Sequence, residues 1–153
     1  MRVVALRRRP ENSSADEMVD TALGPGHLLD LMAASDYVVV TTPLTPETKG
    51  MINSASFKAA KQDQVFINIG RGPVVVEEAL IEALTSGRIR GAALDVFTNE
   101  PLPQSSPLWA TPNLIISPHG ADYTVDSRQS SVRFFTENCE RFLAHEELLN
   151  IVD

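Results

Sequence analysis

The fold is decided by the stretch QVFINIGRGPVVVEEALIEALTSGRIRGAALDVF, which occupies residues 64–97. It opens with an apolar run at 64–69, which predicts a strand, and a glycine-rich turn follows. Residues 77–86 are amphipathic, begin with acidic side chains and stop before Gly87, as expected of a helix. The apolar run at 91–97 predicts a second strand. Two strands joined through a helix lie parallel in one sheet, so this segment predicts a β-α-β unit.

The same alternation of apolar runs and amphipathic segments continues on both sides of this unit. The run YVVVTT at 37–42 is continuous and apolar, which predicts a strand buried in the middle of a sheet. Residues 10–25 show neither pattern and are expected to be the least structured part. Further strands are expected at residues 3–6 and 114–117, and further helices at residues 26–34, 54–61 (with Ser54 as the N-cap) and 124–144. The pattern predicts an α/β fold with a Rossmann-like, doubly wound parallel sheet.

Length and charge narrow the class of protein. A chain of 153 residues is the usual size of one domain, and its net charge of −7 argues against nucleic acid as a partner. The first ten residues carry arginines but no apolar segment of signal-peptide length, and no stretch has the length and apolarity of a membrane span. We therefore expect a soluble protein of the cytoplasm, without a membrane partner.

Three polar residues stand directly after expected strands: Arg71, Glu100 and His119. Taken singly, Arg71 could be a surface turn residue, Glu100 a solvated loop acid and His119 a capping histidine. Together they lie where open parallel sheets bind ligands, at the carboxyl ends of the strands. An arginine forms paired hydrogen bonds to a carboxylate, and a histidine exchanges a proton near neutral pH. The three residues therefore predict a catalytic site for a carboxylate substrate.

The motifs around these residues resemble those of the D-isomer-specific 2-hydroxyacid dehydrogenases, and of glyoxylate/hydroxypyruvate reductases among them. The resemblance rests on four motifs that occur in the family's order: TPLTPETKG at 42–50, NIGRG at 68–72, LDVF with Glu100-Pro101 at 94–101, and SPHG at 117–120. It implies an oxidoreductase that transfers hydride between NAD or NADP and a small 2-oxo or 2-hydroxy acid. The full-length protein is expected to be a homodimer.

By this resemblance, Arg71 binds the substrate carboxylate and His119 protonates the carbonyl oxygen as hydride arrives. Glu100 holds His119, and its negative charge favours the charged imidazolium. Asp95 would anchor the nicotinamide carboxamide, although a strand-end acid that caps the next turn is the simpler alternative. No metal site is expected. The residues expected to bind the cofactor are Arg7, Arg8, Thr42, Pro43, Ile69, Arg71, Asp95, His119 and Gly120.

The glycine-rich phosphate loop of dinucleotide-binding folds has no match in residues 1–153. We do not expect Gly24-Pro25-Gly26 to replace it, because the proline lacks a backbone donor and no strand is expected before it. Residues 1–153 are therefore expected to form a partial dinucleotide-binding domain without the first strand, and to lack a substrate domain. Loss of that central strand would leave two inner sheet edges unpaired, so the chain is expected to be unstable or incomplete, and to have no measurable dehydrogenase activity alone.

Several alternatives stay open. The arginines at 7–9, with Ser13 and Ser14 nearby, suit a 2′-phosphate and favour NADP over NAD, but an arginine run is also common in a solvated turn. Trp109 is consistent with a core residue, a dimer contact or a pocket wall. The chain could instead be a nucleotide-sensing, corepressor-like binding module or a non-functional truncated product.

Overall fold

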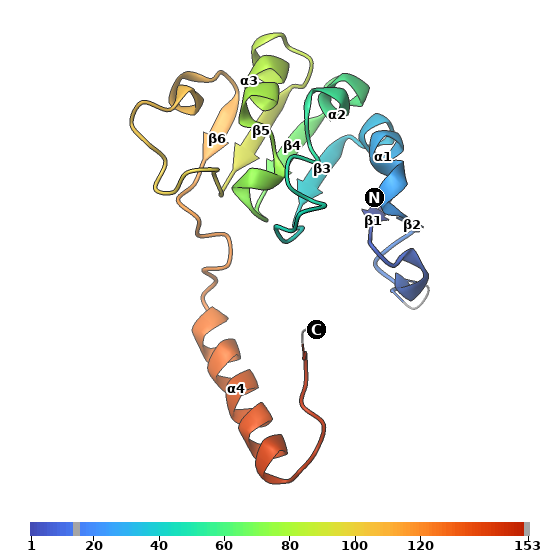
Figure 1. Ribbon diagram of the computed structural model, residues 1–153, viewed down its shortest axis with the longest axis vertical. Coiled ribbons are helices and arrows are strands. Elements are labelled where there is room, and N and C mark those ends of the chain that lie inside the picture. Colours follow the sequence, from blue (N-terminus) through green and yellow to red (C-terminus); the bar gives the residue numbers. More distant parts are fainter. Residues whose placement is uncertain (14–15, 152–153) are drawn as a thin grey trace. The chain divides into compact units, whose positions relative to one another are not determined.

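The computed structural model describes residues 1–13 and 16–151, with Asn12 and Ser13 described by their backbone only, and it divides into two compact units. The first unit ends at His119 and the second begins at Gly120. Figure 1 labels the elements of both. In the first unit these are β1 (Val4–Leu6), β2 (Thr21–Leu23), α1 (Leu28–Ala34), β3 (Tyr37–Val40), α2 (Ser54–Ala59), β4 (Val65–Asn68), α3 (Glu77–Thr85), β5 (Gly91–Leu94) and β6 (Leu114–Ile116).

The strands form two parallel sheets, which confirms the predicted α/β class. Four strands pair in the order β3-β4-β5-β6, with Val38 opposite Phe66 and Phe66 opposite Ala92. The other sheet contains only β1 and β2, with Val4 opposite Thr21. Each of the strands 37–40, 65–68 and 91–94 reaches the next through a helix or a long connection, as parallel pairing requires.

Strand β2 was not expected, because it lies in the segment 10–25 that we predicted to be the least structured. That prediction is wrong for Thr21–Leu23. The strand has only three residues, TAL, which is too short to show a period of its own, and it exists through its pairing with β1.

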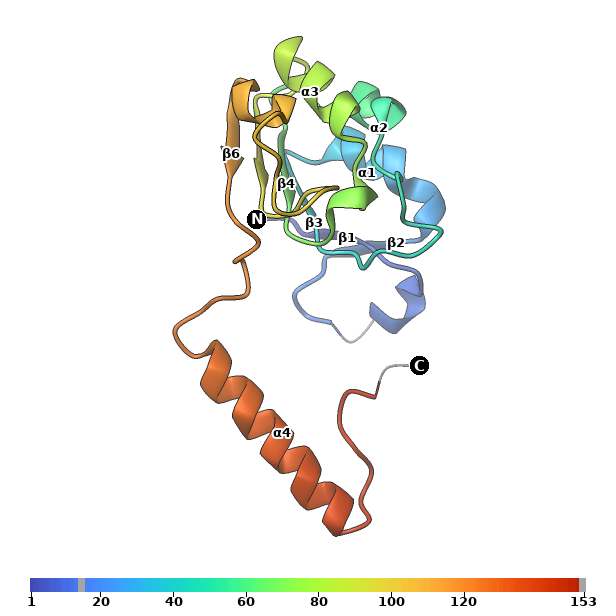
Figure 2. The same cartoon turned by 60° about the vertical axis from the view of Figure 1, so that its left-hand side comes forward.

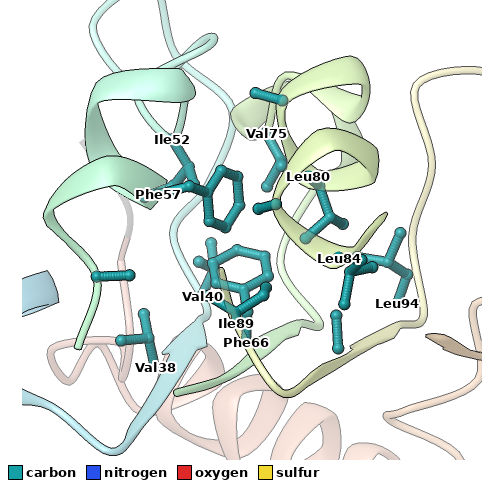
Figure 3. Packing of buried hydrophobic residues seen from close by; sticks show 14 of the residues in the cluster. Val38, Val40, Ile52, Phe57, Phe66, Val75, Leu80, Leu84, Ile89 and Leu94 are labelled. Atoms are coloured by element: carbon teal, nitrogen blue, oxygen red, sulfur yellow. The ribbon is translucent and has the colours of Figure 1, made fainter. Parts of the chain in front are cut away.

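Helices α1, α2 and α3 lie on one side of the four-stranded sheet (Figure 2). The core between them and the sheet is apolar and tightly packed (Figure 3). Phe66 of β4 is completely buried and meets Phe57 of α2 edge to face, with ring centroids 5.3 Å apart and an interplanar angle of 78°. Leu80 of α3 is also fully buried. This core fixes the strands that carry the polar groups.

The opposite face of the sheet is uncovered in the first unit. In β3, Val38 and Val40 are buried, whereas Tyr37 is 60% and Val39 51% exposed. Within the described residues β3 pairs only with β4, and β1 only with β2. The prediction that residues 37–42 form a buried central strand is therefore wrong, because this strand has one neighbour and one covered face.

Helix ends follow local chemistry, with one correction. Asn53, not Ser54, is the N-cap of α2: its side chain accepts a hydrogen bond from the Ala55 N–H, and Ser56 completes a capping box. Helix α3 ends as expected, with Gly87 at a φ of 69° just beyond it.

The second unit contains helix α4 (Ser127–Leu143) and the segments before and after it. The helix confirms the prediction for residues 124–144. Asn138 ties the following segment to the helix, since its Oδ1 accepts the Leu149 N–H at 2.8 Å. No helix in the described part of the chain has both the length and the apolar character needed to cross a membrane.

Candidate active site

The three predicted catalytic residues follow three neighbouring strands. Arg71 comes after β4, Glu100 after β5 and His119 after β6. Because these strands are parallel and adjacent, their carboxyl ends share one edge of the sheet.

Glu100 and His119 form a close pair at this edge. The Oε2 atom of Glu100 lies 2.6 Å from Nδ1 of His119, and its Oε1 accepts the Phe97 N–H at 2.8 Å. The Phe97 hydrogen bond, followed by the His119 hydrogen bond and the charges of His119 and Arg71, lowers the pKa of Glu100. Burial of the carboxyl acts in the opposite direction. Contact through Nδ1 leaves Nε2 of His119 available to another partner.

The backbone of His119 is also unusual. Its φ of 49° lies in the left-handed region, which few residues other than glycine adopt. Such conformations concentrate at functional sites, where the surrounding structure holds them in place. The loop from Phe97 to Glu100 and the turn at His119 therefore present their side chains to each other.

Arg71 lies in the turn between β4 and α3 and is exposed. Its Nη1 donates to the Gly70 carbonyl at 2.6 Å, and its charge acts on Glu100. Gly72 follows, and a Cβ there would overlap the carbonyl group of Phe97. The turn that carries Arg71 therefore packs backbone to backbone against the loop that carries Glu100.

Asp95 is only 4% exposed and lies at the end of β5. The Ser117 hydroxyl donates to its Oδ1 at 2.5 Å, which links β5 to β6 just before His119. We expected Asp95 to be a site residue but assigned no role to Ser117. For Ser117, the available signal in the sequence was its position directly after the strand β6.

An open cavity of about 660 Å³ borders the Glu100–His119 pair. Its walls are largely apolar and include Leu102, Trp109 and Ile116, while Arg71 is not among them. Trp109 is held by a hydrogen bond from its Nε1 to the Pro103 carbonyl at 2.9 Å. Of the alternatives for Trp109, the structure therefore supports a pocket wall.

The residues expected to hold the adenosine and nicotinamide differ in exposure. The Thr42 hydroxyl is buried and has no hydrogen-bond partner within the described residues. Pro43 is exposed beside it, and Ile69 is 42% exposed at the end of β4. A Cβ on Gly70 would lie 2.8 Å from the Thr42 carbonyl oxygen, so the two loops approach closely. Gly120 begins the second unit.

The arginines after β1 have different surroundings. Arg7 pairs with Asp16 at 2.5 Å, with 39% of its side chain exposed. Arg8 is exposed, and its charge contributes to the lowered pKa of Glu47, whose main cause is the Thr45 hydroxyl. Arg8 therefore lies toward the loop that follows Thr42. Ser14 and the side chain of Ser13 lie outside the described residues.

Gly24-Pro25-Gly26 directly follows β2, so the expectation that no strand precedes it is wrong. It begins a 3₁₀ turn that leads into α1, and Pro25 removes a donor from it. No group of His, Cys, Asp or Glu side chains suited to a metal ion occurs in the described part of the chain.

The structure thus places an arginine and a carboxylate–histidine pair after strands of a parallel α/β sheet, at the edge where such sheets bind ligands. Residues 1–121 match the family model described as "D-isomer specific 2-hydroxyacid dehydrogenase, NAD binding domain". The chain belongs to this family of NAD(P)-dependent enzymes.

Its relatives agree. The glyoxylate/hydroxypyruvate reductase B of Serratia proteamaculans is 46% identical over 108 residues, which are 71% of this chain and 33% of that protein. The protein of the same name from an Enterobacter species is 42% identical over 130 residues, 85% of this chain and 40% of that one. The chain thus spans about two fifths or less of the length of these curated relatives.

Solved structures show the same fold. A D-isomer specific 2-hydroxyacid dehydrogenase from Xanthobacter autotrophicus, in complex with NADPH and MES, is 36% identical with a TM-score of 0.80 and matches 100% of this chain and 71% of its own. An NADPH-dependent glyoxylate/hydroxypyruvate reductase from Sinorhizobium meliloti, in complex with NADP and sulfate, is 30% identical with a TM-score of 0.84 and matches 100% of this chain and 48% of its own.

Proposed function

We propose that this chain provides the cofactor-binding and catalytic part of an enzyme that reduces a small 2-oxo acid, such as glyoxylate or hydroxypyruvate, to the D-2-hydroxy acid. The observation that carries this proposal is the 2.6 Å contact between Glu100 and His119, at the sheet edge where Arg71 also follows a strand. The names of the Serratia and Sinorhizobium relatives support the choice of substrates.

Arg71, His119 and Glu100 have separate roles in the proposed reaction. The guanidinium of Arg71 binds the substrate carboxylate through paired, charge-assisted hydrogen bonds and polarises the 2-oxo group. The cofactor, when bound, would supply the hydride for the carbonyl carbon. His119 gives the proton that the carbonyl oxygen takes up, so the products are a hydroxyl group and a neutral imidazole. Glu100 orients the ring through Nδ1 and stabilises its charged form.

For the nicotinamide, Asp95 is our proposed anchor, with Ser117 holding its carboxylate in place. Thr42, Pro43 and Ile69 are proposed to line the rest of the cofactor site, together with Gly120. We also propose NADP over NAD, which the bound NADPH and NADP of the Xanthobacter and Sinorhizobium proteins support. Arg8 is the better candidate for the 2′-phosphate, because Arg7 already pairs with Asp16.

Turnover should require more than residues 1–153. Hydride transfer needs a cofactor held firmly against the substrate and a cleft from which water is excluded. The described residues offer no glycine-rich phosphate turn, and Arg71 does not line the cavity beside Glu100 and His119. Residues 1–153 are accordingly proposed to be part of one dinucleotide-binding domain, and the chain alone is expected to show no measurable turnover.

The test is a chimera in which residues 1–121 replace the matching part of the Serratia reductase. Oxidation of NADPH with glyoxylate or hydroxypyruvate is followed for the chimera and for the chain alone. We expect turnover by the chimera that falls about 100-fold or more in His119→Ala, as loss of a general acid implies. An active His119→Ala chimera, or an inactive chimera that still binds NADPH, would contradict the proposal; the second outcome would favour a nucleotide-sensing binding module.

Cofactor choice is tested in the same chimera by the binding of NADPH and NADH. Arg8→Ala should weaken NADPH binding about 10- to 100-fold and leave NADH binding unchanged, because only NADPH carries the 2′-phosphate. Arg90→Ala removes the same charge just before β5, at the amino ends of the strands, and should change neither. Tighter binding of NADH by the unaltered chimera would contradict the choice of NADP.

The remaining proposals concern the whole protein. We propose a homodimer located in the cytoplasm, with no nucleic acid or membrane partner. The net charge of −7 supports the absence of a nucleic acid partner.

A further inference from the structure

Glu77 contacts the loop that carries Glu100, although nothing in its sequence position indicates it. It is the first residue of α3, and its Oε1 accepts the Thr98 N–H at 2.7 Å. Thr98 is the neighbour of Phe97, whose own N–H holds Oε1 of Glu100. A continuous set of hydrogen bonds and peptide links therefore connects α3 with Glu100 and, through Glu100, with His119.

The same loop is held from a second side. Gly72 lies directly against the Phe97–Thr98 peptide, where any Cβ would overlap the backbone. Gly72 and Glu77 both belong to the connection from β4 into α3, the segment that also carries Arg71. The loop that presents Glu100 is thus attached at two points to the segment that presents Arg71.

The neighbouring acid, Glu78, serves as a comparison for Glu77. Both side chains stand in the first turn of α3, where a negative charge stabilises the helix. Glu78 is exposed, whereas Glu77 is partly buried and reaches the Thr98 amide. Helix stabilisation explains both acids, but it does not explain the contact of one of them with the loop after β5.

We propose that Glu77 is a positioning residue, which fixes the Phe97–Glu100 loop and thereby the orientation of Glu100 toward His119. The geometry stands apart from the proposed reaction, and only its effect on turnover rests on the proposed function. The Thr98 amide is accessible to solvent, so the effect is modest rather than absolute.

The direct test measures the pKa of Glu100 by the carbon NMR shift of its side-chain carboxyl in this chain, assigned with Glu100→Gln. In Glu77→Ala the loop loosens and the Phe97 hydrogen bond weakens, so the pKa of Glu100 should rise. Removal of a nearby negative charge alone would lower this pKa instead. The sign of the change therefore separates positioning from a simple charge effect.

Three matched variants complete the test. Glu77→Gln keeps an acceptor for the Thr98 N–H, and Glu78→Ala removes a charge from the same turn, so neither should raise the pKa of Glu100. Glu77→Asp keeps the charge but shortens the side chain, so it should raise this pKa; it also serves as the deciding variant if Glu77→Ala fails to fold. An unchanged or lowered pKa of Glu100 in Glu77→Asp and in folded Glu77→Ala would overturn the proposal.

The effect on turnover is measured in the Serratia chimera. Glu77→Ala should lower kcat about 3- to 10-fold and leave the KM for NADPH unchanged, because the loop acts on proton transfer and not on cofactor binding. Glu77→Gln should restore kcat. If the chimera shows no turnover at all, the proposed function fails while the NMR result on Glu100 still decides the role of Glu77.

Discussion

The two parallel sheets of the first unit are built from similar apolar strands but are buried very differently. In the four-stranded sheet, alternate residues face three helices, and Phe66 and Asn68 of β4 are almost completely buried. In the two-stranded sheet, no residue of β1 or β2 is buried. Backbone pairing is therefore sufficient to form a strand, but a hydrophobic core forms where helices cover the sheet.

The difference also separates the functional groups. The four-stranded sheet carries Arg71, Glu100 and His119, whose positions rest on a packed core. Arg7 and Arg8 directly follow β1 of the two-stranded sheet, whose residues are only partly buried. We therefore expect Arg71, Glu100 and His119 to be held rigidly, and the site at Arg7 and Arg8, the arginine site, to be adaptable because it is more mobile.

The largest expected effect is on the core of the four-stranded sheet. Phe66→Ala should lower the free energy of unfolding by about 3–5 kcal/mol, because it removes a fully buried ring and its contact with Phe57. Leu6→Ala in the partly buried β1 should cost only about 1 kcal/mol. Urea unfolding followed by circular dichroism measures both. If Phe66→Ala is unfolded in buffer, Phe66→Leu takes its place, and a Leu6→Ala variant that is equally destabilised would remove the distinction between the sheets.

Amide hydrogen exchange should show the same difference residue by residue. Strand β4 pairs on both sides, whereas β1 pairs on one side within the described residues and its side chains are only partly buried. Amides of β4 should therefore exchange slower than those of β1, on the order of 100-fold after correction for intrinsic rates. Equal protection in the two strands would mean that the sheets open as one unit.

The sequence predicted the four-stranded sheet better than the two-stranded one for a physical reason. The runs at 37–42, 64–69 and 91–97 are long and apolar because helices cover them, and burial is what a hydrophobic pattern records. Thr21–Leu23 is short and partly exposed, so only its partner strand defines it. The exposed face of β3 was missed because the sequence YVVV is apolar on both faces, while the described structure covers only one.

The candidate site, like the fold, could be predicted only in part from the sequence. Glu100 and His119 could be predicted together because each follows a strand and the family motifs include both, and the structure brings them to 2.6 Å. Glu77 could not be predicted, since it is 21 residues from Thr98 and its local pattern is that of any first-turn acid. The burial of the unpartnered Thr42 hydroxyl also could not be predicted, because a sequence does not show whether a single atom is buried.

A smaller effect concerns acid stability at Glu100. Its pKa lies below the ordinary value of 4.5, mainly because of the Phe97 N–H. A lowered folded-state pKa gives stability that is fully present above the unfolded value and is lost as the pH falls through the folded one. The difference in Tm between wild type and Glu100→Gln should therefore be largest near pH 7 and shrink below about pH 4.5. Thermal melts across this range test it, with the exposed Glu78→Gln as control; a difference that grows in acid would contradict the assignment.

The smallest effect is expected at Asp16, in the two-stranded region. The hydrogen bond from Arg7 lowers the pKa of Asp16, so any stabilisation is present above its ordinary value of 3.8 and is lost as the pH falls below it. Both side chains are about a third exposed, and salt screens such a pair. Asp16→Asn should leave the urea midpoint unchanged at moderate salt and lower it slightly at low salt. Asp36→Asn, which removes an exposed pair with Lys61 at the same distance of 2.5 Å beside β3, is the matched control. If Asp16→Asn destabilises the chain at high salt and Asp36→Asn does not, the Arg7–Asp16 pair stabilises β1 and β2 more than a screened surface pair would. The arginine site would then be more rigid than its low burial implies.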